Sequence, residues 1–313
     1  MSFPILGLHH VTATVDDAQA DLDFARAALG LRLVKKTVNF DNRGVYHFYY
    51  GDERGTPGSL WTTFPYRLVG VPHGVLGAGQ VTVTSFSVPA GSLDAWKVRL
   101  RAHGMNVRDA EPRFGEESIV VTDPSGLLIE LVASTTDARL PWITDDLDAA
   151  SAVRGIHSVT MTVADPTPTL AFMREWFGFA VAQEMDGRLR VAVNGADPGK
   201  YIDIRTSPDG ARARNGVGTV HHVALAIADA GEQLLMREAL IKRGIAVTPV
   251  MDRSYFQSIY FREPGGVLFE VATLAPGFTV DEPLNELGKG LKLPPWEEAK
   301  RADIEESLPA IHD

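Results

Sequence analysis

The chain repeats one pattern four times, and this repetition constrains its fold more than any other feature. The segment "RGIHSVTMTVADPTPTLAFMREWFGF", which begins at Arg154, aligns with "LGLHHVTATVDDAQADLDFARAALGL", which begins at Leu6. Both segments open with alternating apolar residues, a pattern typical of a half-buried strand. A helical pattern follows and stops at Gly30 in one copy and at Gly178 in the other. Each copy therefore predicts a strand followed by a helix.

Two further blocks match each other. The segment "SLDAWKVRLRAHGMNV" resembles "GEQLLMREALIKRGIAV", and downstream "RFGEESIVVTDPSGLLIELVAS" aligns with "RSYFQSIYFREPGGVLFEVATL". This alignment pairs Arg113 with Arg253 and Glu130 with Glu270. The chain thus divides into four strand–helix–strands modules, near residues 5–66, 78–135, 153–206 and 216–274.

This organisation predicts an α+β fold in which four βαβββ modules form two domains. We expect an N-terminal domain over residues 1–140, containing modules one and two, and a C-terminal domain over residues 150–275, containing modules three and four. The segment "TTDARLPWITDDLDAASAV" between them is rich in turn and acidic residues and is typical of a linker. Residues 276–313 are punctuated by proline and predict an extended arm with a short helix.

Composition excludes several classes of function. The net charge of −10 argues against a nucleic-acid partner, because phosphates select basic surfaces. The absence of cysteine excludes disulfides, thiolate metal sites and thiol nucleophiles. No signal-peptide pattern and no apolar run of about 20 residues is present, so we expect a cytoplasmic protein without a membrane partner. The sequence is also compatible with a homo-oligomer, because the tail or an edge strand could form an interface.

Two pairs of adjacent histidines mark modules one and four, in "LHHVT" and "VHHVA". They occur together with "YHFYYGDERGTPGSLWTTFP", "RFGEE", "DRSYFQSIYFREPGGVLFE" and the "DEPLNELG…LPP" tail. In this combination the chain resembles the vicinal oxygen chelate superfamily, which includes glyoxalase I, extradiol dioxygenases and bleomycin-binding proteins. The closer resemblance is to its hydroquinone-type ring-cleaving dioxygenases, and it covers nearly the whole chain.

The resemblance implies where a metal would bind, because this superfamily builds each site between two modules from first-strand and last-strand positions. Modules two and three place no imidazole there; they offer Val83, Glu130, Ser158 and Asp203. Modules one and four offer two imidazoles, a carboxylate and a threonine: His10, His222, Glu270 and Thr62. We therefore predict one site, with Fe(II), or alternatively Mn(II), held by the two histidines and the glutamate. Such a set leaves about three coordination positions open for substrate and dioxygen.

The resemblance also implies that five further residues surround the substrate: His9, Thr12, His221, Arg253 and Tyr260. Adjacent residues of a regular strand point to opposite faces, so His9 and His221 would need a bulge or a strand end to reach the site. Otherwise they would be packing or outer-face residues.

Comparison of the aligned modules indicates which of these residues are particular to the half with the histidine ligands. Arg113 shares the position of Arg253 in the half without histidine ligands, so this arginine could serve the fold, whereas Tyr260 matches Val120 and is particular to the histidine-bearing half. His47 is predicted to be a core or surface residue rather than a ligand.

Taken together, these features predict a non-haem Fe(II) dioxygenase that cleaves substituted hydroquinones, with a small aromatic compound and O2 as partners. An extradiol catechol dioxygenase could use the same three ligands. A glyoxalase-type lyase or isomerase is disfavoured, because Thr62 stands where a fourth ligand would be. A metal-free binding protein of the bleomycin-resistance kind would not need the matched histidines and glutamate.

Overall fold

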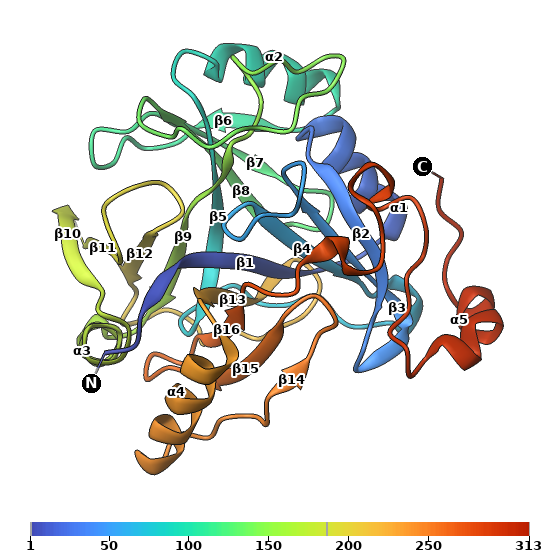
Figure 1. The fold of residues 1–313 in the computed structure, drawn as a ribbon. Coiled ribbons are helices and arrows are strands. Elements are labelled where there is room, and N and C mark those ends of the chain that lie inside the picture. Colours follow the sequence, from blue (N-terminus) through green and yellow to red (C-terminus); the bar gives the residue numbers. More distant parts are fainter. Residues whose placement is uncertain (1, 186, 313) are drawn as a thin grey trace.

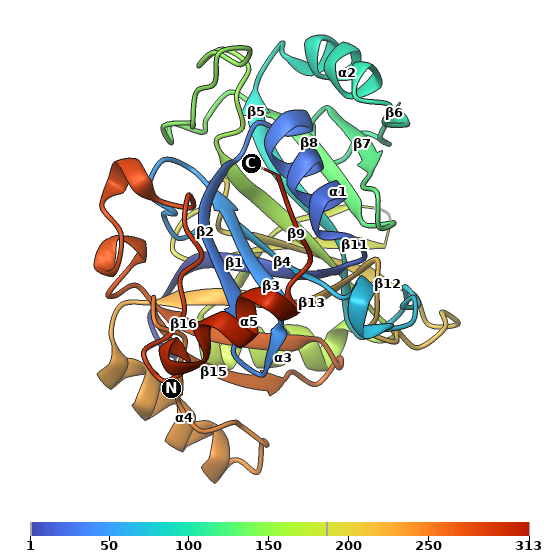
Figure 2. The ribbon, with the colours of Figure 1, turned by 90° about the vertical axis from the view of Figure 1, so that its right-hand side faces the viewer.

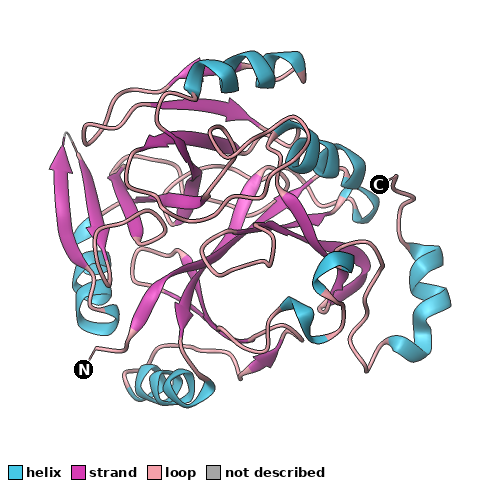
Figure 3. Ribbon diagram, turned by 45° about the horizontal axis from the view of Figure 1, so that its top comes forward, coloured by secondary structure: helices cyan, strands magenta, loops and turns pink. Residues whose placement is uncertain are grey.

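The computed structural model describes residues 2–185 and 187–312 and contains two eight-stranded mixed sheets, with helices around their periphery (Figure 1; Figure 3). The first sheet has the order β14 (Met251–Asp252), β15 (Gln257–Arg262), β16 (Leu268–Thr273), β13 (Thr219–Ile227), β1 (Ile5–Val15), β4 (Leu60–Pro65), β3 (Asn42–Gly51), β2 (Arg32–Asn39). The second sheet has the order β10 (Ala180–Met185), β11 (Arg188–Ala192), β12 (Tyr201–Thr206), β9 (Gly155–Val163), β5 (Gln80–Pro89), β8 (Leu128–Ser134), β7 (Ser118–Thr122), β6 (Val107–Asp109). The predicted α+β class is confirmed.

The first sheet combines modules one and four, which are not neighbours in the sequence. The second sheet combines modules two and three, which are neighbours. Strands β1 and β13 pair antiparallel and join module one to module four, while β5 and β9 join module two to module three. Within every module the first and last strands pair in parallel, as in β1 with β4 and β13 with β16. The predicted domain boundaries at residues 1–140, 150–275 and 276–313 follow chain order and stay a prediction.

The helices begin and end where the sequence patterns place them. They are α1 (Ala18–Leu22), which continues as a π-helix over Asp23–Ala28, α2 (Leu93–Ala102), α3 (Pro166–Phe177) and α4 (Ala230–Lys242). An aspartate side chain accepts a backbone N–H at the start of three of them: Asp17, Asp165 and Asp229. Gly178 ends α3 with a φ of 72°, a conformation that favours glycine. In the described part of the chain, no helix is long and apolar enough to cross a bilayer.

The two faces of the first sheet differ in character. On β1, Val11, Ala13 and Val15 are fully buried in the main hydrophobic core. His10 and Thr12 alternate with them and point to the opposite face, as the period of a strand requires. One face of the sheet therefore builds the core, and the other is available for a polar site.

The C-terminal segment is fastened to the outer strand of this sheet. Its last helix, α5 (Arg301–Ser307), lies beside β3 (Figure 2). Lys35 on β2 is fully buried, and its ammonium group pairs with Glu282 and donates to Asp281 at 2.6 Å. Two carboxylates neutralise this buried charge, so the segment after β16 is fixed in place by an internal ion cluster.

Candidate metal centre

Two bulges bring both histidines of each pair to the same side of the first sheet. In the pairing of β1 with β13, Leu8 lies opposite Leu225 and His10 opposite Ala224, so His9 is an extra residue. On β13, the partners of Thr12 and Ala13 are His222 and Val220, so His221 is likewise extra. One extra residue, and so one bulge, is therefore present at each of the two positions, His9 and His221.

The three predicted ligands converge on one point. The Nε2 atoms of His10 and His222 lie 3.3 Å apart, and the Oε2 atom of Glu270 lies 3.2 Å from the first and 2.7 Å from the second. All three side chains are buried. Among residues 2–185 and 187–312, they form the only group of three or more metal-ligating side chains whose ligand atoms lie within 4.8 Å of one another.

The orientation of these atoms fits a bound cation. The Oε2 atom of Glu270 is buried and has no hydrogen-bond partner, although the Nε2 atoms of His10 and His222 lie close to it. A buried acceptor without a donor is costly, and a cation placed between the three atoms would satisfy it. Two imidazoles and one carboxylate are the ligand set of non-haem Fe(II) oxygenases. The residues present therefore fit a divalent transition metal.

The charge states also suit metal binding. Burial lowers the pKa of His222 below its ordinary value, so the imidazole is neutral near neutral pH. Burial alone would raise the pKa of Glu270, but the neighbouring His10 and His222 outweigh it and hold this pKa well below its ordinary range. A neutral imidazole and an ionised carboxylate are the forms that bind a metal.

Each ligand is oriented by a second group. Ser258 donates a hydrogen bond to the other carboxylate oxygen of Glu270, Oε1. The Nδ1 atoms of His9 and His10 are 2.9 Å apart, and those of His221 and His222 are 2.7 Å apart. In each pair, the bulged histidine contacts the Nδ1 atom of the neighbouring predicted ligand, which is the ring nitrogen that does not face the metal position. Outer groups commonly fix the ring of a metal ligand in this way.

A cavity of about 460 Å³ opens from the three ligands. Four of the five residues predicted around the substrate line it, namely Thr12, His221, Arg253 and Tyr260. His9 does not belong to its lining residues; it lies against Phe256 and faces a smaller hollow of about 210 Å³ beside the C-terminal segment. The remaining wall is largely aromatic: Phe40, Tyr49, Phe64, Tyr66 and Phe256. Its size and lining suit a substituted aromatic ring.

Arg253 and Tyr260 act together at the wall. The Nε–H of Arg253 donates to the phenol oxygen of Tyr260 at 3.1 Å, and its Nη2 pairs with Asp41 at 3.2 Å. Because Tyr260 accepts this bond, its own proton stays available to donate into the cavity. Burial raises the pKa of Tyr260, so the phenol keeps that proton.

Sequence reasoning missed His47, which it assigned to the core or the surface. The half-buried ring of His47 lines the cavity and packs 4.0 Å from the ring of Tyr49 and 4.3 Å from that of Phe64. Its Nε2 lies 3.0 Å from the hydroxyl of Thr62. The strand alternation of "VYHFYY" carries a signal for this position, since His47 and Tyr49 share one face while Tyr46, Phe48 and Tyr50 enter the core.

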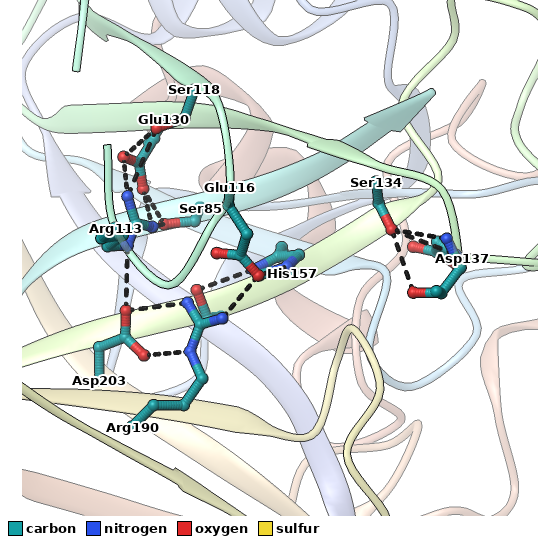
Figure 4. A network of polar contacts seen from close by, with 12 residues as sticks. Ser85, Arg113, Glu116, Ser118, Glu130, Ser134, Asp137, His157, Arg190 and Asp203 are labelled. Atoms are coloured by element: carbon teal, nitrogen blue, oxygen red, sulfur yellow. Dashed lines mark hydrogen bonds and ion pairs between the residues drawn. The ribbon is translucent and has the colours of Figure 1, made fainter. Parts of the chain in front are cut away.

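The second sheet fills the equivalent position with an ion network (Figure 4). The guanidinium group of Arg113 donates to both carboxylate oxygens of Glu130, and its Nε lies 3.1 Å from Asp203. Arg190 in turn donates to Asp203 at 2.7 Å and to Glu116 at 2.6 Å. Glu130, which matches Glu270, and Asp203, which matches Thr62, are therefore both neutralised by arginine.

A model of the Glyoxalase/Bleomycin resistance protein/Dioxygenase superfamily matches residues 7–131 and 155–271. The chain belongs to this superfamily. It is 40% identical over 305 residues to "Putative ring-cleaving dioxygenase MhqE" of Bacillus subtilis (strain 168), an alignment that covers 97% of this chain and 99% of the relative. It is 37% identical over 308 residues to "Chlorohydroquinone/hydroquinone 1,2-dioxygenase" of Sphingobium indicum (strain UT26S), covering 95% of this chain and 94% of that protein.

A solved structure agrees with these relatives. The crystal structure of a "putative dioxygenase" from Bacillus subtilis superposes with a TM-score of 0.94 at 38% identity and covers 99% of both chains. This superfamily member is thus grouped with the ring-cleaving dioxygenases, which are oxidoreductases that incorporate O2. The resemblance seen in the sequence is confirmed.

Proposed function

We propose that this protein is a non-haem Fe(II)-dependent dioxygenase that opens the ring of substituted hydroquinones. The observation that carries the proposal is the convergence of His10, His222 and Glu270 at the wall of a cavity of about 460 Å³ lined by aromatic rings. The name of the Sphingobium relative supports hydroquinone as the substrate class. The ligand set suits Fe(II) and would also accept Mn(II).

Iron bound by the three ligands would supply open coordination positions for the substrate oxygen and O2, and a path for electrons between them. The side chains of the cavity have a different task, which is to hold the ring in place. Phe64 and Phe256 line the cavity, the first beside His221 and the second beside His10, so aromatic rings stand next to the ligands. The proton of Tyr260 is directed to a substrate oxygen, because Arg253 already occupies the acceptor side of the phenol.

His221 also presents a donor to the substrate. A histidine that binds metal through Nε2 carries its proton on Nδ1, so His222 donates to the Nδ1 atom of His221. The proton of the His221 ring must then be on Nε2, and His221 lines the cavity. Tyr260 and His221 would thus hold the substrate oxygen from two strands of module four.

Thr62 argues against a glyoxalase-type reaction. Its hydroxyl contacts Thr12 at 2.7 Å and His47 at 3.0 Å, and the residue does not belong to the cavity lining. A fourth protein ligand from this position is therefore missing.

Oxygen uptake tests the proposal directly. The protein would be loaded with Fe(II) without oxygen and then mixed with air-saturated buffer containing hydroquinone, catechol, or methylglyoxal with glutathione. We expect uptake with hydroquinone and little with the others. Efficient uptake with catechol and none with hydroquinone would replace this proposal with an extradiol dioxygenase, while oxygen-independent turnover of the glutathione adduct would indicate a glyoxalase.

A further inference from the structure

We infer that His47 and Thr62 are positioning residues that set the direction of the Thr12 hydroxyl toward a hydroxyl of the aromatic substrate. This inference rests on the proposed function and deepens it, since it names a set of residues that would recognise the substrate hydroxyl. Three residues from three neighbouring strands carry it: Thr12 on β1, Thr62 on β4 and His47 on β3.

The three side chains form a continuous polar chain. Thr12 and Thr62 lie side by side in the parallel pairing of β1 with β4, with their hydroxyl oxygens 2.7 Å apart. The second contact runs from Thr62 to the Nε2 atom of His47 at 3.0 Å. Both threonines are fully buried, and only the two ends of the chain, Thr12 and His47, line the cavity. Thr62 is thus a bridge behind the wall.

The hydrogen-bond directions at Thr62 depend on where the protons lie. The Thr62 hydroxyl has one proton, and its side-chain hydrogen-bond neighbours are Thr12 and His47. Because Thr62 is fully buried and an unpaired buried proton is costly, the hydroxyl donates to one of them and accepts from the other. If the Nε2 atom of His47 carries a proton, His47 donates to Thr62, Thr62 donates to Thr12, and the Thr12 proton points into the cavity. If Nε2 carries none, every bond reverses and Thr12 presents an acceptor. The tautomer of His47 therefore sets what the substrate meets at Thr12.

The position of Thr12 relates this chain to the metal ligands. Thr12 follows His10 by two residues on the same face of β1, which places the two side chains about 7 Å apart along the strand. A ring oxygen held beside His10 is therefore within reach of the Thr12 hydroxyl. The ring of His47 is in turn held by its contacts with Tyr49 and Phe64. The Thr12 hydroxyl would thus contact the substrate hydroxyl, and its orientation would be fixed by His47 through Thr62.

The test measures binding without oxygen, so that turnover is not required. Manganese-loaded protein would be titrated anaerobically with hydroquinone, using the wild type, Thr62→Val and His47→Phe. Thr62→Val keeps the shape of the side chain and His47→Phe keeps an aromatic ring, while each removes one hydrogen bond. Each should weaken binding roughly tenfold while metal content stays unchanged. The double variant should bind no more weakly than either single variant, because both changes break one chain. Thr62→Ser should restore binding, and Thr160→Val, at the matching position of Thr12 in the second sheet, should leave it unchanged.

A second readout reports on the chain itself. Nitrogen NMR of the labelled imidazoles should show one tautomer for His47 in the wild type and a mixture in Thr62→Val. Unchanged hydroquinone binding in both single variants, or additive losses in the double variant, would overturn the inference. Wild-type protein that binds hydroquinone in this way but consumes no oxygen with it would refute the proposed function and leave the inference intact.

Discussion

A single extra residue in each of two central strands, β1 and β13, adds a second histidine beside each predicted metal ligand. Without the bulge at His9, either Leu8 or His10 would change faces, and the same holds for Val220 and His222 around His221. Leu8 and Val220 remain in the main core, while the histidine after each bulge faces the site. In the proposed site, one ring of each pair would bind the metal and the other would hold that ring in orientation.

Ligand and substrate-contact roles can be separated by substitution. His10→Ala, His222→Ala and Glu270→Ala should each abolish metal retention and turnover, because two ligands are too few to hold the ion. Tyr260→Phe removes one hydrogen bond, keeps the ring, and should retain iron with a roughly tenfold to hundredfold loss in kcat/KM. Metal analysis after desalting and steady-state kinetics would measure both. Loss of iron from Tyr260→Phe together with its retention by His222→Ala would refute the assignment.

At the scale of secondary-structure elements, buried polar groups tie helices and strands together. Asp21 on α1 is buried and accepts hydrogen bonds from Tyr50 on β3 at 2.7 Å and from Thr63 on β4 at 2.5 Å. The first helix of the chain is therefore fixed to two strands of the sheet through one carboxyl group.

This carboxyl group makes stability depend on pH. Burial raises the pKa of Asp21 from 3.8 to about 7, so the folded state binds a proton that the unfolded state releases between these values. The free energy of unfolding should consequently fall as the pH rises from about 4 to about 7. Asp21→Asn mimics the protonated form, and its urea-unfolding free energy should vary less over this range. The exposed Asp109→Asn should keep the wild-type dependence, and an equally steep slope in Asp21→Asn would contradict this interpretation.

The ion network of the second sheet should be a stability element. Arg113→Met leaves the buried Glu130 without its cation and weakens the set around Asp203, so we expect a loss of about 3–5 kcal/mol in the free energy of unfolding. Arg67→Met, which breaks exposed pairs with Asp16 and Asp17, should cost about 1 kcal/mol or less. Equal losses in the two variants would show that the network contributes no more than a surface pair.

For the whole molecule, the chain places its first and last repeats in one sheet. His10 and His222 are far apart in the sequence, and the pairing of β1 with β13 brings them together. The resemblance to the superfamily implied these ligands, and the aligned modules showed which of them carry histidine and glutamate at the positions concerned. His47 was not predictable in the same way, since a lone histidine in an aromatic strand bears no local mark and its partner Thr62 lies on another strand. Arg113 occupies the matching position in the second sheet, and this too could not be predicted, because the spacing of residues in the sequence does not specify side-chain geometry.

This asymmetry predicts one metal ion per chain. Glu130 and Asp203 are neutralised by Arg113 and Arg190 and have no imidazole beside them in the ligand positions, so only the first sheet should bind iron. Protein loaded anaerobically with excess Fe(II) and then desalted should contain about one ion per chain by elemental analysis. Two tightly held ions would contradict the assignment of the second site.

The most direct test of the central claim follows the fate of oxygen atoms. Iron-loaded protein would be given hydroquinone under ¹⁸O2, and the ring-opened product analysed by mass spectrometry at early times. A ring-cleaving dioxygenase should place both labelled atoms in an open-chain product, and Glu270→Ala protein should yield none. An oxidised product with an intact ring and no label, with the label recovered in water or peroxide instead, would contradict the account.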